Sequence, residues 1–169
     1  MNASTIKKCS AAVVLGLMAL LPGYLTLTTS DAGIKLIADF EGCQLTPYQC
    51  SAGIWTSGIG HTAGVIPQGH ITDQKAAENL LADIKTVEKG LKNCMSVEMP
   101  QAVYDSVVAF TFNVGVRASC HSTLAFFINK RQWRDACEQL PRWVFVKGVR
   151  SAGLERRRAA ERTLCLSSL

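Results

Sequence analysis

EGCQLTPYQCSAGIWTSGIGHT, residues 41–62, is the stretch of the sequence that decides the fold. It follows a segment of helical periodicity, residues 31–40, and Gly42 favours the end of that helix directly after Glu41. Beyond it, closely spaced glycines and short alternating stretches predict a small antiparallel sheet with tight turns between residues 46 and 71. Glu41, Cys50 and Thr56 are spaced nine and then six residues apart, so we expect all three side chains to meet at this sheet.

Helical patterns dominate the chain after the sheet. A long helix is predicted from residue 72 or 73 to 91, because Ala76, Leu80 and Ile84 lie on one apolar stripe. Further helices are expected after Pro100 and over residues 124–129, 133–140 and 154–166. The pattern therefore predicts an α+β fold, with a small antiparallel sheet lobe and a helical lobe joined by the long helix and a cleft between the lobes.

The N-terminus is expected to engage a membrane. Lys7 and Lys8 precede an uncharged run from Cys9 to Ser30, and 22 residues of helix would span about 33 Å at about 1.5 Å per residue. The positive charge predicts a cytoplasmic N-terminus, and polar residues and glycines predict weak insertion. We interpret residues 1–30 as an uncleaved signal anchor and residues 31–169 as the folded domain; a cleaved secretory signal is the alternative.

The distribution of charge and the number of cysteines indicate which partners and which cellular compartment to expect. Residues 130–169 hold 10 Lys and Arg against 4 Asp and Glu, whereas residues 1–129 hold 8 against 9. This basic third favours an anionic partner, and charge alone leaves nucleic acid, an acidic membrane and cell-wall glycan open. Seven cysteines indicate an exported protein with disulfides, and the odd count leaves one thiol over in a monomer.

Glu41, Cys50 and Thr56 supply a carboxyl, a thiol and a hydroxyl, which are groups that hydrolysis can use. Partial burial can keep a carboxyl such as that of Glu41 protonated and able to act as a general acid, while Cys50 and Thr56 could hold and activate a water. Glycoside hydrolysis needs this division of labour. The spacing alone is weak evidence, because a Glu near a Cys and a Thr occurs by chance in many exported proteins.

Several ordered motifs over residues 31–166 resemble the phage-type lysozymes. The family's set is Glu, Asp and Thr, and the run Thr56-Ser57-Gly58-Ile59-Gly60-His61-Thr62 resembles its glycine-rich hairpin. Phe110-Thr111-Phe112-Asn113-Val114-Gly115 resembles its central buried helix, and Arg131-Gln132-Trp133 a later helix start. Gly153-Leu154-Glu155-Arg156-Arg157-Arg158-Ala159-Ala160-Glu161 resembles its terminal Gly-Leu-x-x-Arg-Arg-x-x-Glu motif.

The resemblance implies a lysozyme-like fold and a muramidase that cleaves peptidoglycan, with Glu41 as general acid and Thr56 helping to place the water. The departure is Cys50, which stands where the family has Asp. A thiol has an ordinary pKa of about 8.5, so position 50 can supply a base or nucleophile only where its surroundings lower that value. A catalytically silent wall-binding protein and a membrane-anchored interaction module are the alternative functions.

The chain also resembles the subgroup of endolysins with an N-terminal signal-arrest-release segment and a catalytic cysteine. By that resemblance, a Cys43–Cys50 bond locks the membrane-bound enzyme, and Cys9 pairs with Cys43 after release and frees Cys50; a permanent Cys43–Cys50 bridge is the alternative. With these three assigned, elimination and helical position favour structural disulfides Cys94–Cys120 and Cys137–Cys165, although six cysteines permit 15 arrangements.

The resemblance implies three further roles. His61 and Asp83 are expected to form a structural ion pair, and Arg157 to bind substrate or position Glu41. The partners implied are bacterial peptidoglycan and the host inner membrane, crossed once and then left for the periplasm, with a monomeric protein and no nucleic acid. No spacing typical of a zinc site, phosphate loop or dinucleotide site is present, so no cofactor or metal is expected.

Overall fold

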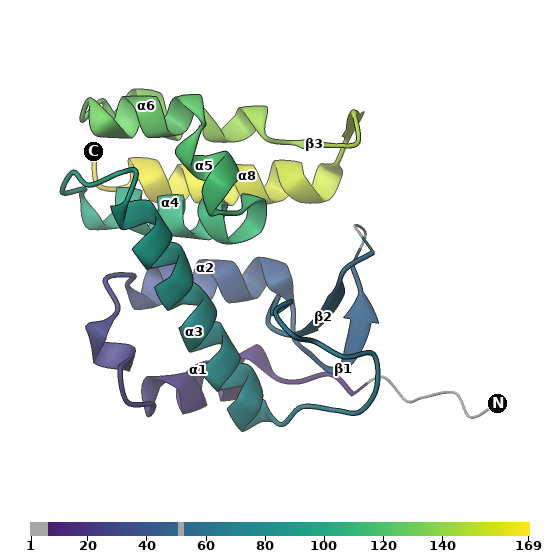
Figure 1. Ribbon diagram of the computed structural model, residues 1–169. Helices are drawn as coiled ribbons and strands as arrows, with labels where there is room; N and C mark the ends of the chain where they lie inside the picture. Colours follow the sequence, from purple (N-terminus) through teal and green to yellow (C-terminus); the bar gives the residue numbers. More distant parts are fainter. Residues whose placement is uncertain (1–6, 51–52) are drawn as a thin grey trace. The chain divides into compact units, whose positions relative to one another are not determined.

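The structure is a computed structural model that describes residues 7–50 and 53–169 (Figure 1). Its chain divides into two compact units. Unit 1 comprises the N-terminal residues to Leu27 together with Ala38–Asp83, and unit 2 comprises Thr28–Ile37 together with Ile84–Leu169. The chain passes between the units three times: between Leu27 and Thr28, inside α2 (Asp31–Glu41) and inside α3 (Asp73–Lys92). The expected α+β architecture, with the 20-residue α3 as the long helix, is confirmed.

In unit 1, the N-terminal segment folds as part of the domain. Helix α1 (Ala11–Ala19) buries Val14 and Met18 completely, and a 3-10 turn, η1 (Tyr24–Thr26), follows it. Residues 9–30 therefore do not form the single 22-residue helix expected for a bilayer. The physical reason is local: Pro22 disfavours continuation of a helix, and Gly23 has a φ of +94°. Among the described residues, no helix has the length and apolar character needed to cross a membrane.

Residues 7–9 lie alongside the start of β1 (Gln44–Gln49), where Lys8 forms an isolated antiparallel bridge with Gln44. The Leu45 N–H donates to the Lys7 carbonyl at 2.8 Å, and the Cys9 N–H donates to the Cys43 carbonyl at 3.3 Å. A disulfide between Cys9 and Cys43 fixes this pairing. Residues 7–9 are thus held against the segment that leads from Glu41 to Cys50.

Strands β1 and β2 (Trp55–Gly58) form the antiparallel hairpin of unit 1. Tyr48 lies opposite Thr56, and Gln49 lies opposite Trp55, with an irregularity in register between Gln44 and Tyr48. The sheet is shorter than expected: turns and loops connect β2 to α3. Ile71 nevertheless rejoins it, because its N–H donates to the Leu45 carbonyl at 3.0 Å.

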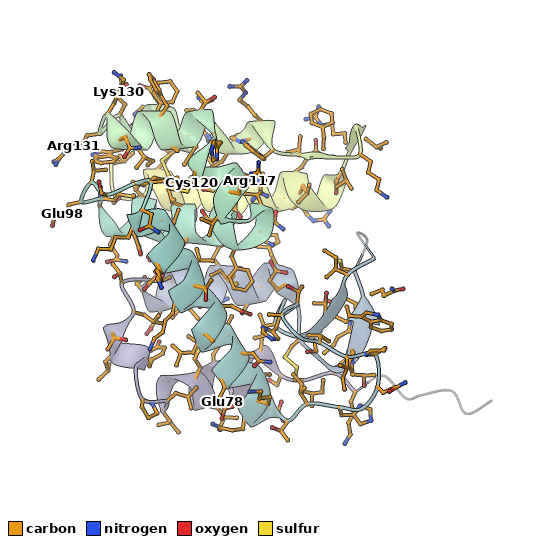
Figure 2. All side chains as sticks on the ribbon, viewed as in Figure 1. Glu78, Glu98, Arg117, Cys120, Lys130 and Arg131 are labelled. Carbon is orange, nitrogen blue, oxygen red and sulfur yellow. A yellow bond between two sulfur atoms is a disulfide. The ribbon has the colours of Figure 1, made fainter. Side chains whose placement is uncertain are left out.

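Unit 2 is a helical layer built around α4 (Gln101–Val114), which packs along α8 (Ala152–Leu166), as Figure 1 shows. Eight of the 14 residues of α4 are buried, and the Phe110 ring meets Trp143 edge to face with centroids 5.2 Å apart. Two disulfides, Cys94–Cys120 and Cys137–Cys165, link elements of this unit; Cys120 is labelled in Figure 2. The remaining elements are α5 (Val116–Cys120), α6 (Thr123–Asn129), α7 (Trp133–Cys137), η2 (Leu140–Arg142), β3 (Phe145–Val146) and β4 (Val149–Arg150).

Candidate active site

Glu41 is the last residue of α2, and two glycines shape its surroundings. Gly42 has a φ of +68°, a left-handed conformation that ends the helix without a side-chain clash. Gly60, with a φ of +72°, lies against the carboxylate: a Cβ built there would be 2.9 Å from Glu41 Oε2. The missing side chain at position 60 therefore leaves the space that the Glu41 carboxylate occupies.

Cys50 and Thr56 lie on the β1–β2 hairpin of the same unit. Cys50 directly follows β1, and its backbone N–H donates to the Ile54 carbonyl at 3.0 Å. Thr56 is in β2, is only 3% exposed, and its hydroxyl donates to the same Ile54 carbonyl at 3.1 Å. These bonds hold a half-buried thiol and a buried hydroxyl on a closed hairpin.

Tyr48 connects the three candidate residues. It is directly opposite Thr56 in the sheet, and it is two residues before Cys50, so the pleat directs its side chain to the face of the sheet that carries both. Burial raises the pKa of the Tyr48 phenol, and the nearby Glu41 carboxylate and Cys50 thiol raise it further. Glu41 and Cys50 thus lie near enough to Tyr48 to raise the pKa of its phenol, and Thr56 lies opposite Tyr48 in the sheet.

Sequence patterns alone did not identify Tyr48 and Gly60 as residues of the candidate site. The alternation of a strand places position 48 on the face of position 50, so this signal was available for Tyr48. Nothing local identifies Gly60, because its role depends on the approach of α2 to the loop after β2.

The cysteines near the site are in one defined state. Cys43 is bonded to Cys9, and Cys50 stands outside the three disulfides of the described chain. Cys50 therefore carries a thiol, which lies near enough to Tyr48 to raise the pKa of that phenol. This is the arrangement expected by resemblance for the released enzyme, and the Cys43–Cys50 bond expected for the locked enzyme is not the one in this structure.

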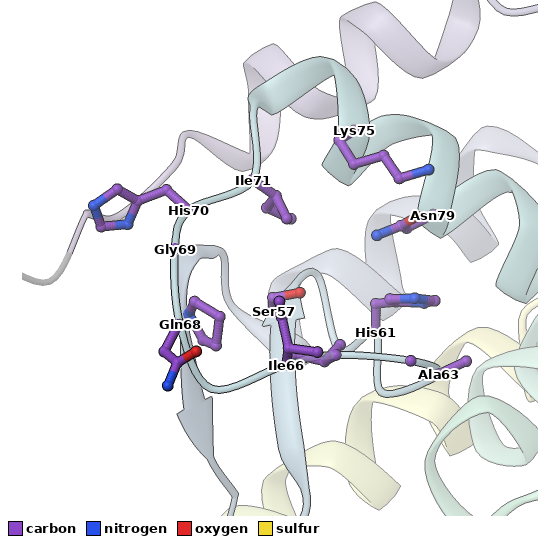
Figure 3. A pocket seen from close by; sticks show the side chains of 13 residues that line it. Ser57, His61, Ala63, Ile66, Gln68, Gly69, His70, Ile71, Lys75 and Asn79 are labelled. Carbon is purple, nitrogen blue, oxygen red and sulfur yellow. The ribbon is translucent and has the colours of Figure 1, made fainter.

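His61 is held by Asp83 rather than by the candidate catalytic residues. His61 Nδ1 is 2.8 Å from Asp83 Oδ2, and the two side chains are 13% and 24% exposed. Burial raises the pKa of Asp83, while the hydrogen bond and the charge of His61 lower it. His61 also lines a cavity of about 360 Å³ with Ser57, His70, Lys75 and Asn79 (Figure 3). The residues that line this cavity do not include Glu41, Cys50 or Thr56.

Arg157 belongs to a buried charged cluster in unit 2. Arg157 Nε donates to Glu161 Oε1 at 3.0 Å, and its guanidinium donates to the Ala109 carbonyl at 3.2 Å. Arg158 pairs with the other oxygen of Glu161 and with Asn113, and lies 4.9 Å from the Phe110 ring centroid. Burial raises the pKa of Glu161, against the opposing effect of both arginines. These two arginines are not a solvated helix face; they tie α8 to α4.

Within the described ranges, His, Cys, Asp and Glu side chains do not gather in threes that could hold a metal ion.

Comparison with known proteins adds four findings. The family model described as phage lysozyme matches residues 38–161. The SAR-endolysin of Escherichia phage P1 is 32% identical, over 95% of this chain and 92% of the relative. Among solved structures, the active form of P1 phage endolysin Lyz superposes with a TM-score of 0.85 at 32% identity, covering 95% of this chain and 96% of that one. The secreted inactive form of the same endolysin reaches a TM-score of 0.57 at 30% identity, over 82% and 96%.

Proposed function

The chain belongs to the phage lysozyme family, and from this membership we propose that it is a phage endolysin that lyses the host cell. It is a glycoside hydrolase, a muramidase that cleaves the β-1,4 linkage from N-acetylmuramic acid to N-acetylglucosamine in peptidoglycan. The site assignment is supported by the register that sets Thr56 opposite Tyr48, by the position of Cys50 two residues after Tyr48, and by the approach of Gly60 to the Glu41 carboxylate.

Glu41 is the general acid of this proposal. A glycosidase must protonate the leaving oxygen while a second group directs water or itself attacks the anomeric carbon. Because Gly60 has no side chain, residue 60 does not displace the Glu41 carboxylate. The end of α2 fixes the backbone of Glu41. The buried Thr56 hydroxyl is positioned by Ile54 and helps to place the attacking water.

Cys50 takes the remaining role of base or nucleophile. A thiol is mostly neutral at pH 7 when its pKa is near the ordinary value of about 8.5, so its reactivity depends on the hairpin around it. The disulfide between Cys9 and Cys43 leaves the Cys50 sulfur available for that role.

The test is loss of turbidity of permeabilised bacterial cells. Reduced wild-type protein should clear them, whereas folded Glu41→Gln should not, because the amide cannot donate the proton. Glu78→Gln is the matched control, since Glu78 lies in the same unit and its contacts, an ion pair with Lys75 and a hydrogen bond from Gln74, are at the surface. Clearing by Glu41→Gln would exclude the assignment, and a product with an added water, rather than an anhydro sugar, would exclude a lytic transglycosylase.

We further propose where the enzyme is located in the host cell and how disulfide exchange controls its activity. The enzyme begins on the host inner membrane through residues 1–30, crossing once with a cytoplasmic N-terminus, and is later released as a monomer into the periplasm. While it is inserted, a Cys43–Cys50 bond blocks the catalytic thiol; after release, Cys9 attacks that bond and pairs with Cys43. Two observations support this proposal. The structure contains the Cys9–Cys43 bond, and its TM-score is higher against the active form of the P1 endolysin than against the inactive form.

A further inference from the structure

Unit 2 contains a cavity of about 690 Å³ beside the end of α3. Its walls come from the C-terminal half of α3, from the loop of residues 93–100, from the start of α4 and from Thr28. The residues that line it do not include Glu41, Cys50 or Thr56, so the proposed cleavage reaction does not account for this cavity.

Three lysines of α3 line the cavity from one side of that helix. Lys85, Lys89 and Lys92 are spaced four and three residues apart, which is the spacing of neighbours on one helix face. All three are exposed, and no ion pair joins any of them to a carboxylate within residues 7–50 and 53–169. Their ammonium groups are therefore available to an anionic ligand.

Two carboxylates share the lining with these lysines. Glu88 is engaged by donors of the chain itself, because its Oε1 accepts hydrogen bonds from the N–H groups of Thr28 and Thr29 and from the Thr29 hydroxyl. Glu98 lies in the loop after α3 and is exposed, and Figure 2 labels it. The lysines outnumber these two carboxylates, so the wall of the cavity keeps a positive charge.

Apolar side chains lie in the same lining. Met95, Val97 and Met99 come from the loop after α3, and Tyr104 comes from α4. Met95 is only 3% exposed, whereas the other three are partly exposed. Methionine is flexible and polarizable, so such a wall adapts to apolar groups of different shapes. A ligand in this cavity would meet cations and apolar side chains together.

Thr28 connects the cavity with the segment that is expected to enter the membrane. It directly follows Leu27, where the N-terminal part of unit 1 ends, and it lies near the end of the uncharged run from Cys9 to Ser30. Consecutive Cα atoms are about 3.8 Å apart. A bilayer that holds residues 9–27 would therefore place Thr28 at the level of its headgroups, together with the lysines that share the cavity.

We propose that this cavity binds the headgroup of an anionic phospholipid in the membrane surface from which residues 9–27 emerge. The phosphate would meet Lys89 and Lys92, and the glycerol and the first methylene groups would pack on Val97 and Met99. The inference rests on the membrane location given under the proposed function. An acidic peptide or a nucleic acid could meet the same lysines, but the position of Thr28 in the chain brings only the lipid to them.

The test uses the full chain with the Cys9–Cys43 bond, verified by disulfide mapping, so that the N-terminal segment is packed in unit 1. This protein should bind vesicles of phosphatidylglycerol and phosphatidylcholine more tightly than vesicles of phosphatidylcholine alone. Lys89→Gln with Lys92→Gln should weaken binding to the anionic vesicles by about thirtyfold, because two ammonium groups lose their attraction to the surface. Binding to pure phosphatidylcholine should not change.

The matched control is Arg134→Gln with Arg156→Gln. It removes the same charge from exposed side chains of unit 2 that do not line the cavity. This variant should bind the anionic vesicles nearly as tightly as wild type. An equal loss in the lysine variant and the control would overturn the proposal, because net charge alone would then explain the binding.

Methionine methyl resonances locate the ligand on the full chain. Dihexanoyl phosphatidylglycerol, added below its critical micelle concentration, should shift the signal of Met99 in the cavity but not that of Met18, which is fully buried in unit 1. Inorganic phosphate at the same concentration should leave Met99 unchanged. A Met99 signal that stays in place with the lipid, or that shifts equally with phosphate, would contradict a lipid site.

A lysis assay keeps this inference separate from the proposed function. Lys89→Gln with Lys92→Gln should clear permeabilised cells as fast as wild type, because neither lysine belongs to the unit that carries Glu41. Lipid binding without clearing by wild type would contradict the proposed function alone. Clearing without selective lipid binding would contradict this inference alone.

Discussion

At the scale of the residue, the approach of Gly60 to Glu41 is the most sharply testable contact of the site. Gly60→Ala should lower the rate of peptidoglycan cleavage at least about tenfold, because the new Cβ would displace a carboxylate that is 2.9 Å away. The alanine would also cost about 1–2 kcal/mol of stability at a φ of +72°. Cleavage rates and denaturant unfolding of the same preparations measure both effects.

Gly64 supplies the control for backbone strain. Its φ is +68°, and a Cβ built there has no neighbour within 4 Å in the described chain. Gly64→Ala should therefore lose a similar free energy of unfolding but keep its activity. An equal loss of activity in both variants would mean that strain in the loop, rather than contact with Glu41, explains the effect.

At the scale of the element, α3 and α4 hold the residues that lead into α2. Glu88 Oε1 accepts hydrogen bonds from the N–H groups of Thr28 and Thr29, at 2.9 and 2.7 Å, and from the Thr29 hydroxyl at 2.6 Å. Asp105, only 1% exposed, accepts from the Ser30 N–H at 2.9 Å and from its hydroxyl. Two carboxylates thus fix the start of α2, the helix that carries Glu41 at its other end.

Glu88→Ala should lower the free energy of unfolding by about 2–3 kcal/mol, because three donors lose a charged acceptor that lies only partly buried. Glu98→Ala is the comparison, since Glu98 is exposed beside the same cavity and should change stability by less than about 0.5 kcal/mol. Denaturant unfolding with intact disulfides measures the difference. Indistinguishable midpoints would show that the bonds to Thr28 and Thr29 are replaced by water at no cost.

At the scale of the whole molecule, the disulfide pattern couples the N-terminal segment to the site. Cys9→Ser should leave the released protein with a Cys43–Cys50 bond and without lytic activity, because the thiol that resolves this bond is absent. The double variant Cys9→Ser with Cys43→Ser should be active without any exchange, since Cys50 then has no partner near it to lock it. Disulfide mapping and turbidity assays of both proteins measure these outcomes.

The exchange also predicts different pairings in different fractions of wild-type protein. Membrane-bound protein should contain Cys43–Cys50, and released protein should contain the Cys9–Cys43 bond of this structure. Finding one pairing in both fractions, or full lytic activity of released Cys9→Ser, would rule out control by exchange.

Local patterns in the sequence predicted most of the regular structure. Asp31 and Gly42 marked the bounds of α2, and the stripe through Ala76 and Leu80 marked α3 to within one residue at each end. Helix α5 and the β3–β4 hairpin were not predicted, because segments of five and two residues carry too little periodicity. The resemblance also indicated Glu41, Cys50 and Thr56 as site residues; in the structure Glu41 ends α2, Cys50 directly follows β1 and Thr56 lies in β2.

By itself, then, the sequence determined the family, the order of the elements and the residues of the candidate site, because these follow from short-range periodicity and from motifs that are contiguous in the chain. Only the tertiary structure decided that Gly60 approaches Glu41, that Glu88 and Asp105 hold Thr28 to Ser30, and that residues 7–9 pair with β1. Each of these depends on contacts between distant parts of the chain. Whether residues 9–27 pack into unit 1 or lie in a bilayer depends in addition on the solvent around them, because the same apolar side chains suit both surroundings.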